Sequence, residues 1–223
     1  MKTIVHKCLV VIVFSLAAYQ ATAELPRISS SEGRHGLIVD GAPYLLLCAQ
    51  VNNSSNYVSA LPDVWPAIRD LGANTVQVNV AWEQVEPEEG EFDFSFVDAL
   101  LSQARDNDVR LILLWFGAFK NTSPSYAPAW VKLDNERFPR IVQQDGSLSY
   151  ALTPLSQATR AADKRAFVAL MQHLARNDEQ HTVIMVQVEN EVGTYGSVRD
   201  YSDDANALFE KAPPGALLDA LGA

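Results

Sequence analysis

Two short acidic segments attract attention because each follows a run of apolar residues. Residues 189–191 (Glu-Asn-Glu) follow the apolar run 183–188, and residues 82–87 (Trp-Glu-Gln-Val-Glu-Pro) follow the β-branched run 75–80. Cleavage of a glycosidic bond needs one carboxylic acid that protonates the leaving oxygen and a second carboxylate on the other side of the anomeric carbon. In retaining enzymes the two carboxyl groups lie about 5 Å apart, and the second attacks directly. Carboxyl groups placed at strand ends are candidates for this chemistry.

The segment 189–191 holds two glutamates, and residue periodicity alone does not choose between them. In an extended strand, Gln187, Glu189 and Glu191 would share one face, and Asn190 would lie on the other. An asparagine beside the acid is useful because its amide can hold a sugar hydroxyl while the neighbouring carboxyl donates its proton. The alternative is that both glutamates are rim carboxylates that cap a loop and have no catalytic role.

The elements that hold these segments are predicted from the pattern of apolar residues. Strands are expected at residues 45–48, 75–80, 111–116 and 183–188. Helices are expected from Asp63 to about Gly72, along the stripe Val97, Leu100, Leu101 and Ala104, and along the stripe Phe167, Leu170, Met171 and Leu174. Strands that alternate with helices form right-handed βαβ units around a parallel sheet. In such a sheet the catalytic groups gather at the carboxyl ends of the strands.

The predicted fold class is α/β of the (β/α)₈ TIM-barrel type, and the pattern indicates only the first four βα units. A closed barrel typically needs about 250 residues. A half barrel leaves its first and fourth strands as unpaired edges, which is an aggregation hazard. A small hairpin is expected at 37–45 and a further helix near Ser202. The polar excursion 121–159 is either an active-site wall or a tolerated surface insertion, and both alternatives stay open.

The first 23 residues have the composition of a signal peptide. Lys2 and Lys7 precede an apolar run at 9–18, and Ala-Thr-Ala at 21–23 offers a small-x-small cleavage site. The apolar run is too short for a membrane span, which needs about 20 residues. We therefore expect export to the periplasm or the medium, no membrane association after cleavage, and a mature domain at 24–223.

Charge and metal-ligand patterns exclude several classes of partner. A net charge of −10 disfavours binding to nucleic acid or anionic lipid and is compatible with a neutral carbohydrate substrate. Cys48 is the one cysteine of the mature domain, which rules out an internal disulfide. His35, His173 and His181 are scattered without the spacing of a zinc site, so neither a metal nor a cofactor is predicted. The oligomeric state is left open.

Residues 184–191, followed by Gly193, Tyr195 and Gly196, resemble the acid/base segment of glycoside hydrolase families 35 and 42, the β-galactosidases of the large retaining (β/α)₈ clan. Three further segments agree in the same order: 74–77 (Asn-Thr-Val-Gln), 82–94 with its Glu-Pro, Gly and Phe-Asp-Phe, and 128–130 (Pro-Ala-Trp). The resemblance covers most of residues 37–210 and is strong because four motifs occur in the correct order.

The resemblance assigns roles to individual residues. In the clan the glutamate directly after the asparagine is the acid/base, which selects Glu191 over Glu189. Asn190 resembles the residue that contacts the sugar 2-hydroxyl, and Glu86 resembles a glutamate with a structural role. A pocket is expected to raise the pKa of Glu191 so that this carboxyl is protonated near neutral pH.

Other candidate substrate contacts are less determined. Trp82 and Trp115 either stack on a sugar ring or pack at the barrel rim, and both alternatives stay open. Asn79 is a further candidate, and it stands where family 35 commonly has a tyrosine. Family 35 also has Gly-Pro-Tyr and a later Ala-Glu-Trp where this chain has residues 115–121, and the galactose-binding Ala-Glu pair has no counterpart that aligns. The resemblance implies β-galactosides of oligo- or polysaccharides, while an arabinoside or another plant-wall glycoside stays open.

The leading hypothesis is the amino-terminal half of an exported retaining glycosidase. The clan's nucleophile is a glutamate at the end of strand seven, and no residue of 1–223 matches it, so the chain alone is predicted to lack turnover. A non-catalytic carbohydrate-binding half-barrel module is the alternative. A periplasmic scaffold without a sugar site is a third hypothesis, but it leaves the ordered motifs unexplained.

Overall fold

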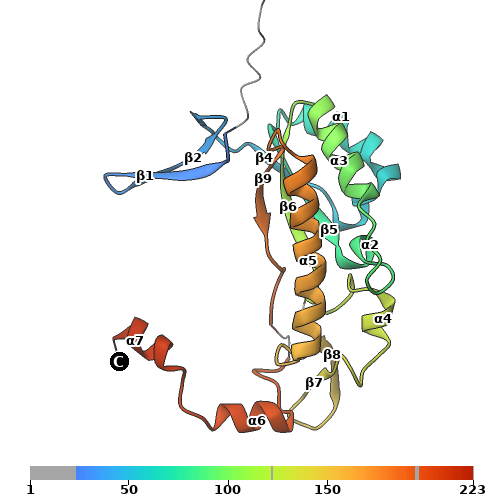
Figure 1. The fold of residues 1–223 in the computed structure, drawn as a ribbon, viewed down its shortest axis with the longest axis vertical. Helices are drawn as coiled ribbons and strands as arrows, with labels where there is room; N and C mark the ends of the chain where they lie inside the picture. The colour runs from blue at the N-terminus through green and yellow to red at the C-terminus, as the bar shows by residue number, and fades with distance from the viewer. Residues whose placement is uncertain (1–23, 122, 194–195, 223) are drawn as a thin grey trace, which may run out of the picture.

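The computed structural model describes residues 24–121, 123–193 and 196–222 (Figure 1). The predicted signal peptide at 1–23 lies outside the described residues. Within the described part of the chain, none of the helices combines the length and the apolar character that crossing a membrane requires.

A four-stranded parallel sheet forms the centre of the fold. Its strands are β4 (Cys48–Gln50), β5 (Thr75–Ala81), β6 (Arg110–Phe116) and β9 (Val183–Gln187), hydrogen-bonded in the order β4-β5-β6-β9. The partial barrel with β4 and β9 at its edges confirms the predicted fold class and the predicted edge strands.

The first strand is displaced from its predicted position. It was expected at 45–48 and lies at Cys48–Gln50, so that the two ranges share only Cys48. The reason is the Asn74 side chain, which accepts a hydrogen bond from the Leu47 N–H (2.9 Å) and donates one to the Leu45 carbonyl (2.8 Å). An amide thus replaces strand pairing there, and both leucine side chains stay exposed.

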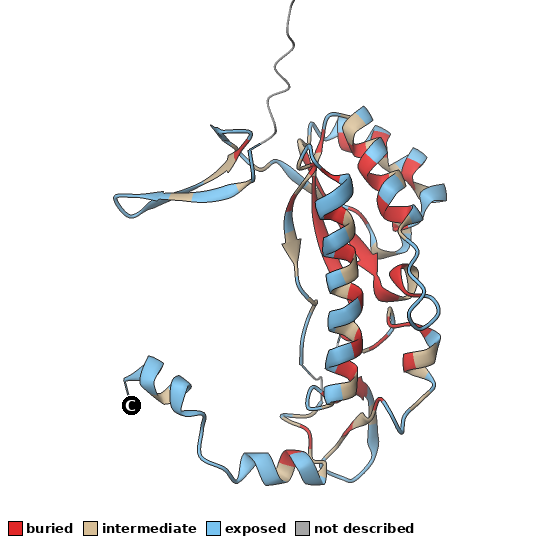
Figure 2. Ribbon diagram, viewed as in Figure 1, coloured by how far each residue is buried: buried red, intermediate tan, exposed pale blue. Residues whose placement is uncertain are grey.

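Three helices cover one face of the sheet: α1 (Leu61–Asp70), α3 (Ser95–Asp106) and α5 (Gln157–Asn177) (Figures 1 and 2). The α3 stripe is buried as predicted against alternate residues of β5 and β6. The α5 stripe is only partly right, because Leu170 and Leu174 are buried while Met171 is 37% exposed. Helix α1 starts at Leu61, two residues before the expected Asp63, and Pro66 lies inside it.

The opposite face of the sheet carries an amino-terminal hairpin at one end. This extended hairpin has three antiparallel strands: β1 (Arg27–Ser31), β2 (Arg34–Val39) and the short β3 (Ala42–Pro43). The β2–β3 turn was predicted, whereas β1 was not, because its serine-rich sequence has no apolar alternation. Val39 packs against Ile112 and Ile184 of the sheet. Figure 1 shows the rest of the hairpin extending away from the sheet.

The loops at the carboxyl ends of the strands carry the remaining elements. These are two 3₁₀ turns (Asn53–Ser55 and Val58–Ala60), α2 (Trp82–Val85), α4 (Ala129–Lys132), the antiparallel pair β7 (Arg140–Val142) and β8 (Leu148–Leu152), α6 (Asp203–Phe209) and α7 (Gly215–Leu221). The excursion 121–159 is therefore structured. The helix expected near Ser202 is present as α6, and the Ser202 hydroxyl caps it.

Candidate functional site

The turn after β9 departs from the extended geometry that the sequence suggested. Strand β9 ends at Gln187, and both glutamates beyond it have left-handed backbone conformations, with φ of 62° at Glu189 and 54° at Glu191. Such angles are uncommon for residues other than glycine and are found in tight turns and functional segments. The predicted alternation is wrong here, since the two side chains leave a turn and do not share one strand face.

Glu191 points to an exposed site on the loop after β6. Its Oε2 accepts hydrogen bonds from the Lys120 ammonium and from the backbone N–H of Asn121, both at 2.9 Å. The Lys120 hydrogen bond is the main cause that holds the pKa of Glu191 below its usual value. The expected raised pKa is therefore wrong for this arrangement, because a cation faces an open carboxylate where a closed pocket was expected.

Glu189 has the environment that was expected of Glu191. Its two carboxyl oxygens lie 3.2 Å from the Ala118 N–H and 3.1 Å from the Phe119 N–H. Burial first, and then a hydrogen bond to Asp163 and the charge of that residue, raise the pKa of Glu189 to about 9. Glu189 therefore carries a proton at neutral pH. Sequence reasoning did not predict this environment for Glu189. The presence of a second glutamate in the motif was the only sign of it in the sequence.

Asp163 on α5 completes a carboxyl pair with Glu189. Its carboxylate accepts hydrogen bonds from the Trp115 indole N–H (2.7 Å) and from the Ala118 N–H (3.1 Å). A Cβ placed on Gly117 would lie 2.5 Å from Asp163 Oδ1 and 2.6 Å from Glu189 Oε1. The glycine thus lets both acidic groups approach the backbone after β6.

The two tryptophans predicted to contact substrate are part of the packing. Trp115 is 1% exposed and its indole N–H binds Asp163; Trp82 is fully buried and its indole N–H donates to Glu86 Oε2 (2.9 Å). Both rings lie in the core between the sheet and the helices. Neither presents a face to a sugar, so in this structure both follow the packing alternative and not their candidate role as substrate contacts.

Glu86 lies at the end of α2 and is fully buried. It accepts hydrogen bonds from the Gly90 N–H (2.8 Å) and from Arg165 Nη2 (2.6 Å), in addition to the Trp82 indole. These contacts fasten the α2 turn to helix α5, which is the kind of structural role that the resemblance implied.

Asn79 and Asn190 share an unusual property. Asn79 is 1% exposed, and among the described residues both polar atoms of its side chain lack a hydrogen-bond partner; the buried Asn190 Oδ1 lacks one in the same sense. An unpaired buried polar group costs about 1–3 kcal/mol. Asn79 is covered in this structure, so a direct sugar contact is not available to it here, contrary to its predicted role.

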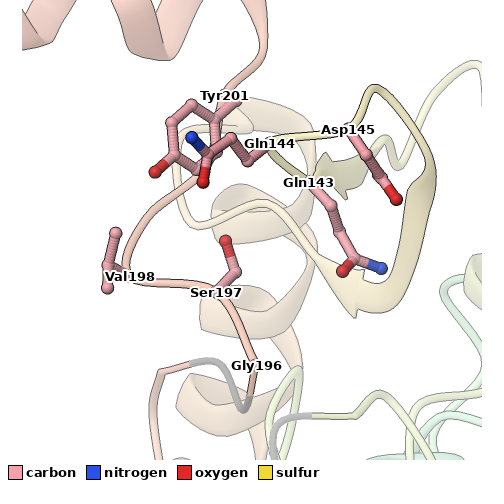
Figure 3. A pocket seen from close by; sticks show the side chains of 7 residues that line it. All are labelled: Gln143, Gln144, Asp145, Gly196, Ser197, Val198 and Tyr201. Carbon is pink, nitrogen blue, oxygen red and sulfur yellow. The ribbon is translucent and has the colours of Figure 1, made fainter.

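Two of the hollows in the described part of the chain lie beside the segments that follow β9 and β7. One, of about 160 Å³, is bordered by Phe119, Thr159, Arg160 and the pair Asp163 and Glu189. The other, of about 280 Å³, lies between the β7–β8 turn and the segment that leads to α6 (Figure 3). It is lined by Gln143, Gln144, Asp145, Gly196, Ser197, Val198 and Tyr201. Within the described ranges, no group of three or more His, Cys, Asp or Glu side chains is placed to hold a metal ion.

Comparison with known proteins relates this geometry to one enzyme family. A family model for glycoside hydrolase 42, described as β-galactosidase, matches residues 60–212. The chain is 31% identical over 209 residues to a β-galactosidase of Xanthomonas manihotis, with 90% of this chain and 33% of that protein covered. It is 26% identical over 165 residues to β-galactosidase BbgII of Bifidobacterium bifidum, with coverage of 67% and 22%. The chain thus spans a third or less of the length of these relatives.

Solved structures show the same fold at low sequence identity. The catalytic domain of a β-amylase from Paenibacillus polymyxa superposes with a TM-score of 0.54 at 14% identity, over 79% of this chain and 47% of that one. A cold-adapted β-galactosidase from Rahnella sp. R3 superposes with a TM-score of 0.53 at 21% identity, over 67% and 22%.

Proposed function

The chain belongs to the glycoside hydrolase 42 family of β-galactosidases, and we propose that it provides the acid/base half of the active site of an exported, retaining enzyme that cleaves β-galactosides. The observation that carries this proposal is the Asn190-Glu191 turn at the carboxyl end of β9. It places an accessible carboxyl group against the loop after β6, at the end of the sheet where barrel enzymes bind substrate.

Glu191 is suited to protonate a leaving oxygen once a substrate covers it. One of its oxygens is held by Lys120 and Asn121, and its side chain is 44% exposed. The lowered pKa of the Glu191 carboxyl agrees with an open site that holds only half of the catalytic groups. A second carboxylate about 5 Å away, together with a closed pocket, would raise the pKa of Glu191 and supply the proton donor that retaining hydrolysis requires.

The second carboxylate is proposed to come from a further βα unit that pairs beyond the edge strand β9. The groups that hold Glu191 in this chain are a lysine and a backbone N–H, which stabilise a carboxylate but do not attack an anomeric carbon. Accordingly, this chain alone is expected to have no turnover.

Asn190 is proposed to contact the sugar 2-hydroxyl. Its Oδ1 is buried and unpaired among the described residues, so an incoming hydroxyl donor would satisfy it. Asn79 is proposed to join this contact only if closure of the barrel uncovers its amide, whose two polar atoms are likewise unpaired.

The proposal is tested by completing the barrel. The 223-residue chain and a chimera with the remaining part of the Xanthomonas relative would be assayed on aryl β-galactosides after circular dichroism confirms folding. We expect no turnover from the chain, turnover from the chimera, and a loss of about 10²- to 10⁴-fold in kcat with Glu191→Gln. Turnover by the chain alone that Glu191→Gln abolishes would contradict the half-site. A folded, monodisperse chain that binds galactosides while the folded chimera stays inactive would favour the binding-module alternative.

A further inference from the structure

Two glutamates of one turn bind consecutive residues of one loop. Glu189 accepts from the N–H groups of Ala118 and Phe119, and Glu191 accepts from Lys120 and from the N–H of Asn121. The segment after β9 is therefore fixed to the segment after β6 at two places. The first place is half-buried and the second is exposed, so the first is the stronger candidate for setting the position of both.

The half-buried contact depends on a residue from a third element. Asp163 reaches it from α5, and its carboxylate is fixed by the Trp115 indole and the Ala118 N–H. Because the Ala118 N–H lies within reach of both acidic side chains, the two carboxyl groups meet at one donor. Both carboxyl groups also lie so close to Gly117 that a Cβ at this position would overlap them.

Two carboxyl groups this close are stable together when one proton lies between them, since two ionised forms would repel. The charged groups around the pair do not replace that proton. Arg160 of α5 borders the adjoining hollow and is exposed, and its guanidinium binds Gln157. Lys120, on the loop after β6, binds Glu191 and the Asn121 side chain. The Arg160 guanidinium, which borders this hollow, therefore binds Gln157 and not the carboxyl pair.

We propose that Asp163 is a positioning residue for the acid/base turn: it keeps a proton on Glu189, and the pair that shares this proton holds Glu191 against residues 120–121. This rests on the proposed function only in naming Glu191 as the acid/base. The described contacts make Asp163 act through Glu189, and no contact links it to the reacting atoms.

Removing the shared proton would release the turn. Above the pKa of Glu189, two ionised carboxylates would share the Ala118 N–H, and their repulsion would move Glu189 away from α5. Because only Asn190 separates the two glutamates, Glu191 would then lose its contact with Lys120. The adjoining hollow gives the pair a route for exchanging its proton with solvent.

The test follows the glutamate side-chain carboxyl carbons by ¹³C NMR in the 223-residue chain, where no catalytic activity is needed. The Glu189 signal, identified by its loss in Glu189→Gln, should titrate with a midpoint of about 9. Asp163→Asn should lower that midpoint by at least about one pH unit, a tenfold change in proton affinity, because it removes the charged neighbour. Asp98→Asn is the matched control, since Asp98 binds His173 of α5 and should leave the midpoint unchanged.

The positioning role has its own readout. The Glu191 signal, identified with Glu191→Gln, should shift a second time at the midpoint of Glu189 in the unmodified chain. In Glu189→Gln, whose amide imitates the protonated form, that second shift should be absent. A Glu189 midpoint near 4.5, or a Glu191 signal indifferent to both Glu189 ionisation and Asp163→Asn, would overturn the proposal. An inactive chimera would affect the proposed function and would leave these titrations as they stand.

Discussion

Glu86 and Glu189 both follow strands of the same sheet, but the fully buried Glu86 and the half-buried Glu189 are stabilised in opposite ways. Glu86 has a guanidinium partner, an indole N–H and a backbone N–H. Glu189 faces another acid, and a proton takes the place of a cation. The first arrangement fixes a scaffold, while the second sets up a group that responds to pH beside the proposed catalytic residue. Burial of a carboxyl group alone does not tell which of the two is present.

The largest effect is expected from removing the scaffold carboxyl. Glu86→Ala should lower the free energy of unfolding by about 3–5 kcal/mol, because it opens a cavity and leaves the buried Trp82 indole without an acceptor. Urea denaturation followed by tryptophan fluorescence measures it. Glu89→Ala is the matched control, since Glu89 binds Arg137 on the surface and should cost less than about 1 kcal/mol. Equal effects would remove the distinction between scaffold and surface acids.

The next effect concerns the close approach at the carboxyl pair. Gly117→Ala should destabilise the fold by about 1–3 kcal/mol, because its Cβ would overlap the Asp163 and Glu189 oxygens. Gly36→Ala meets open space and is the comparison variant. If thermal unfolding gives both variants the same midpoint, then the pair does not lie against Gly117 as described.

Stability should also depend on pH through Glu189. Its pKa is raised to about 9 in the folded chain, so between about pH 4.5 and 9 the folded state holds one more proton than the unfolded state. The favourable contribution is complete below pH 4.5 and is lost as the pH rises through 9. The slope is at most about 1.4 kcal/mol per pH unit and less with solvent screening. Urea midpoints from pH 5 to 8.5 should fall more steeply in the unmodified chain than in Glu189→Gln; parallel slopes would contradict a proton on Glu189.

The unpaired amide of Asn79 predicts a gain where most core substitutions lose. Asn79→Leu should be neutral or stabilise the chain by about 1 kcal/mol, because it removes two buried polar atoms that have no hydrogen-bond partner among the described residues. Thr75→Val is the control, since the Thr75 hydroxyl is hydrogen-bonded and its loss should destabilise. A marked loss with Asn79→Leu in chemical denaturation would reveal a partner for this amide.

The smallest effect on stability belongs to the exposed end of the turn. Lys120→Ala should have little effect on the free energy of unfolding, because the carboxylate of its ion pair with Glu191 is exposed. The same variant should raise the pKa of Glu191 towards its usual value, since Lys120 is the main cause of its depression. A carboxyl ¹³C titration of Glu191 measures this shift, and an unchanged pKa would show that the two side chains do not meet.

The sequence predicted the elements whose signal is local. The α3 stripe, the strand at 111–116 and the helix near Ser202 were predicted from short stretches of sequence, and the structure has each of them. What it missed depends on contacts between distant segments. Asn74 binds the segment before the first strand and displaces that strand, and Asp163 accepts the hydrogen bond of the buried Trp115 indole. The exchange of environments between Glu189 and Glu191 arises from a left-handed turn, which strand alternation cannot anticipate.

Dependence on the leaving group tests most directly whether Glu191, and not Glu189, is the acid. In the barrel-completing chimera, kcat/KM would be compared on lactose, whose leaving group needs a proton, and on 2,4-dinitrophenyl β-galactoside, whose leaving group does not. The account predicts that Glu191→Gln slows lactose cleavage by about 10²-fold or more and largely spares the dinitrophenyl substrate, whereas Glu189→Gln affects both alike. Selective loss of lactose cleavage with Glu189→Gln, and not with Glu191→Gln, would contradict it.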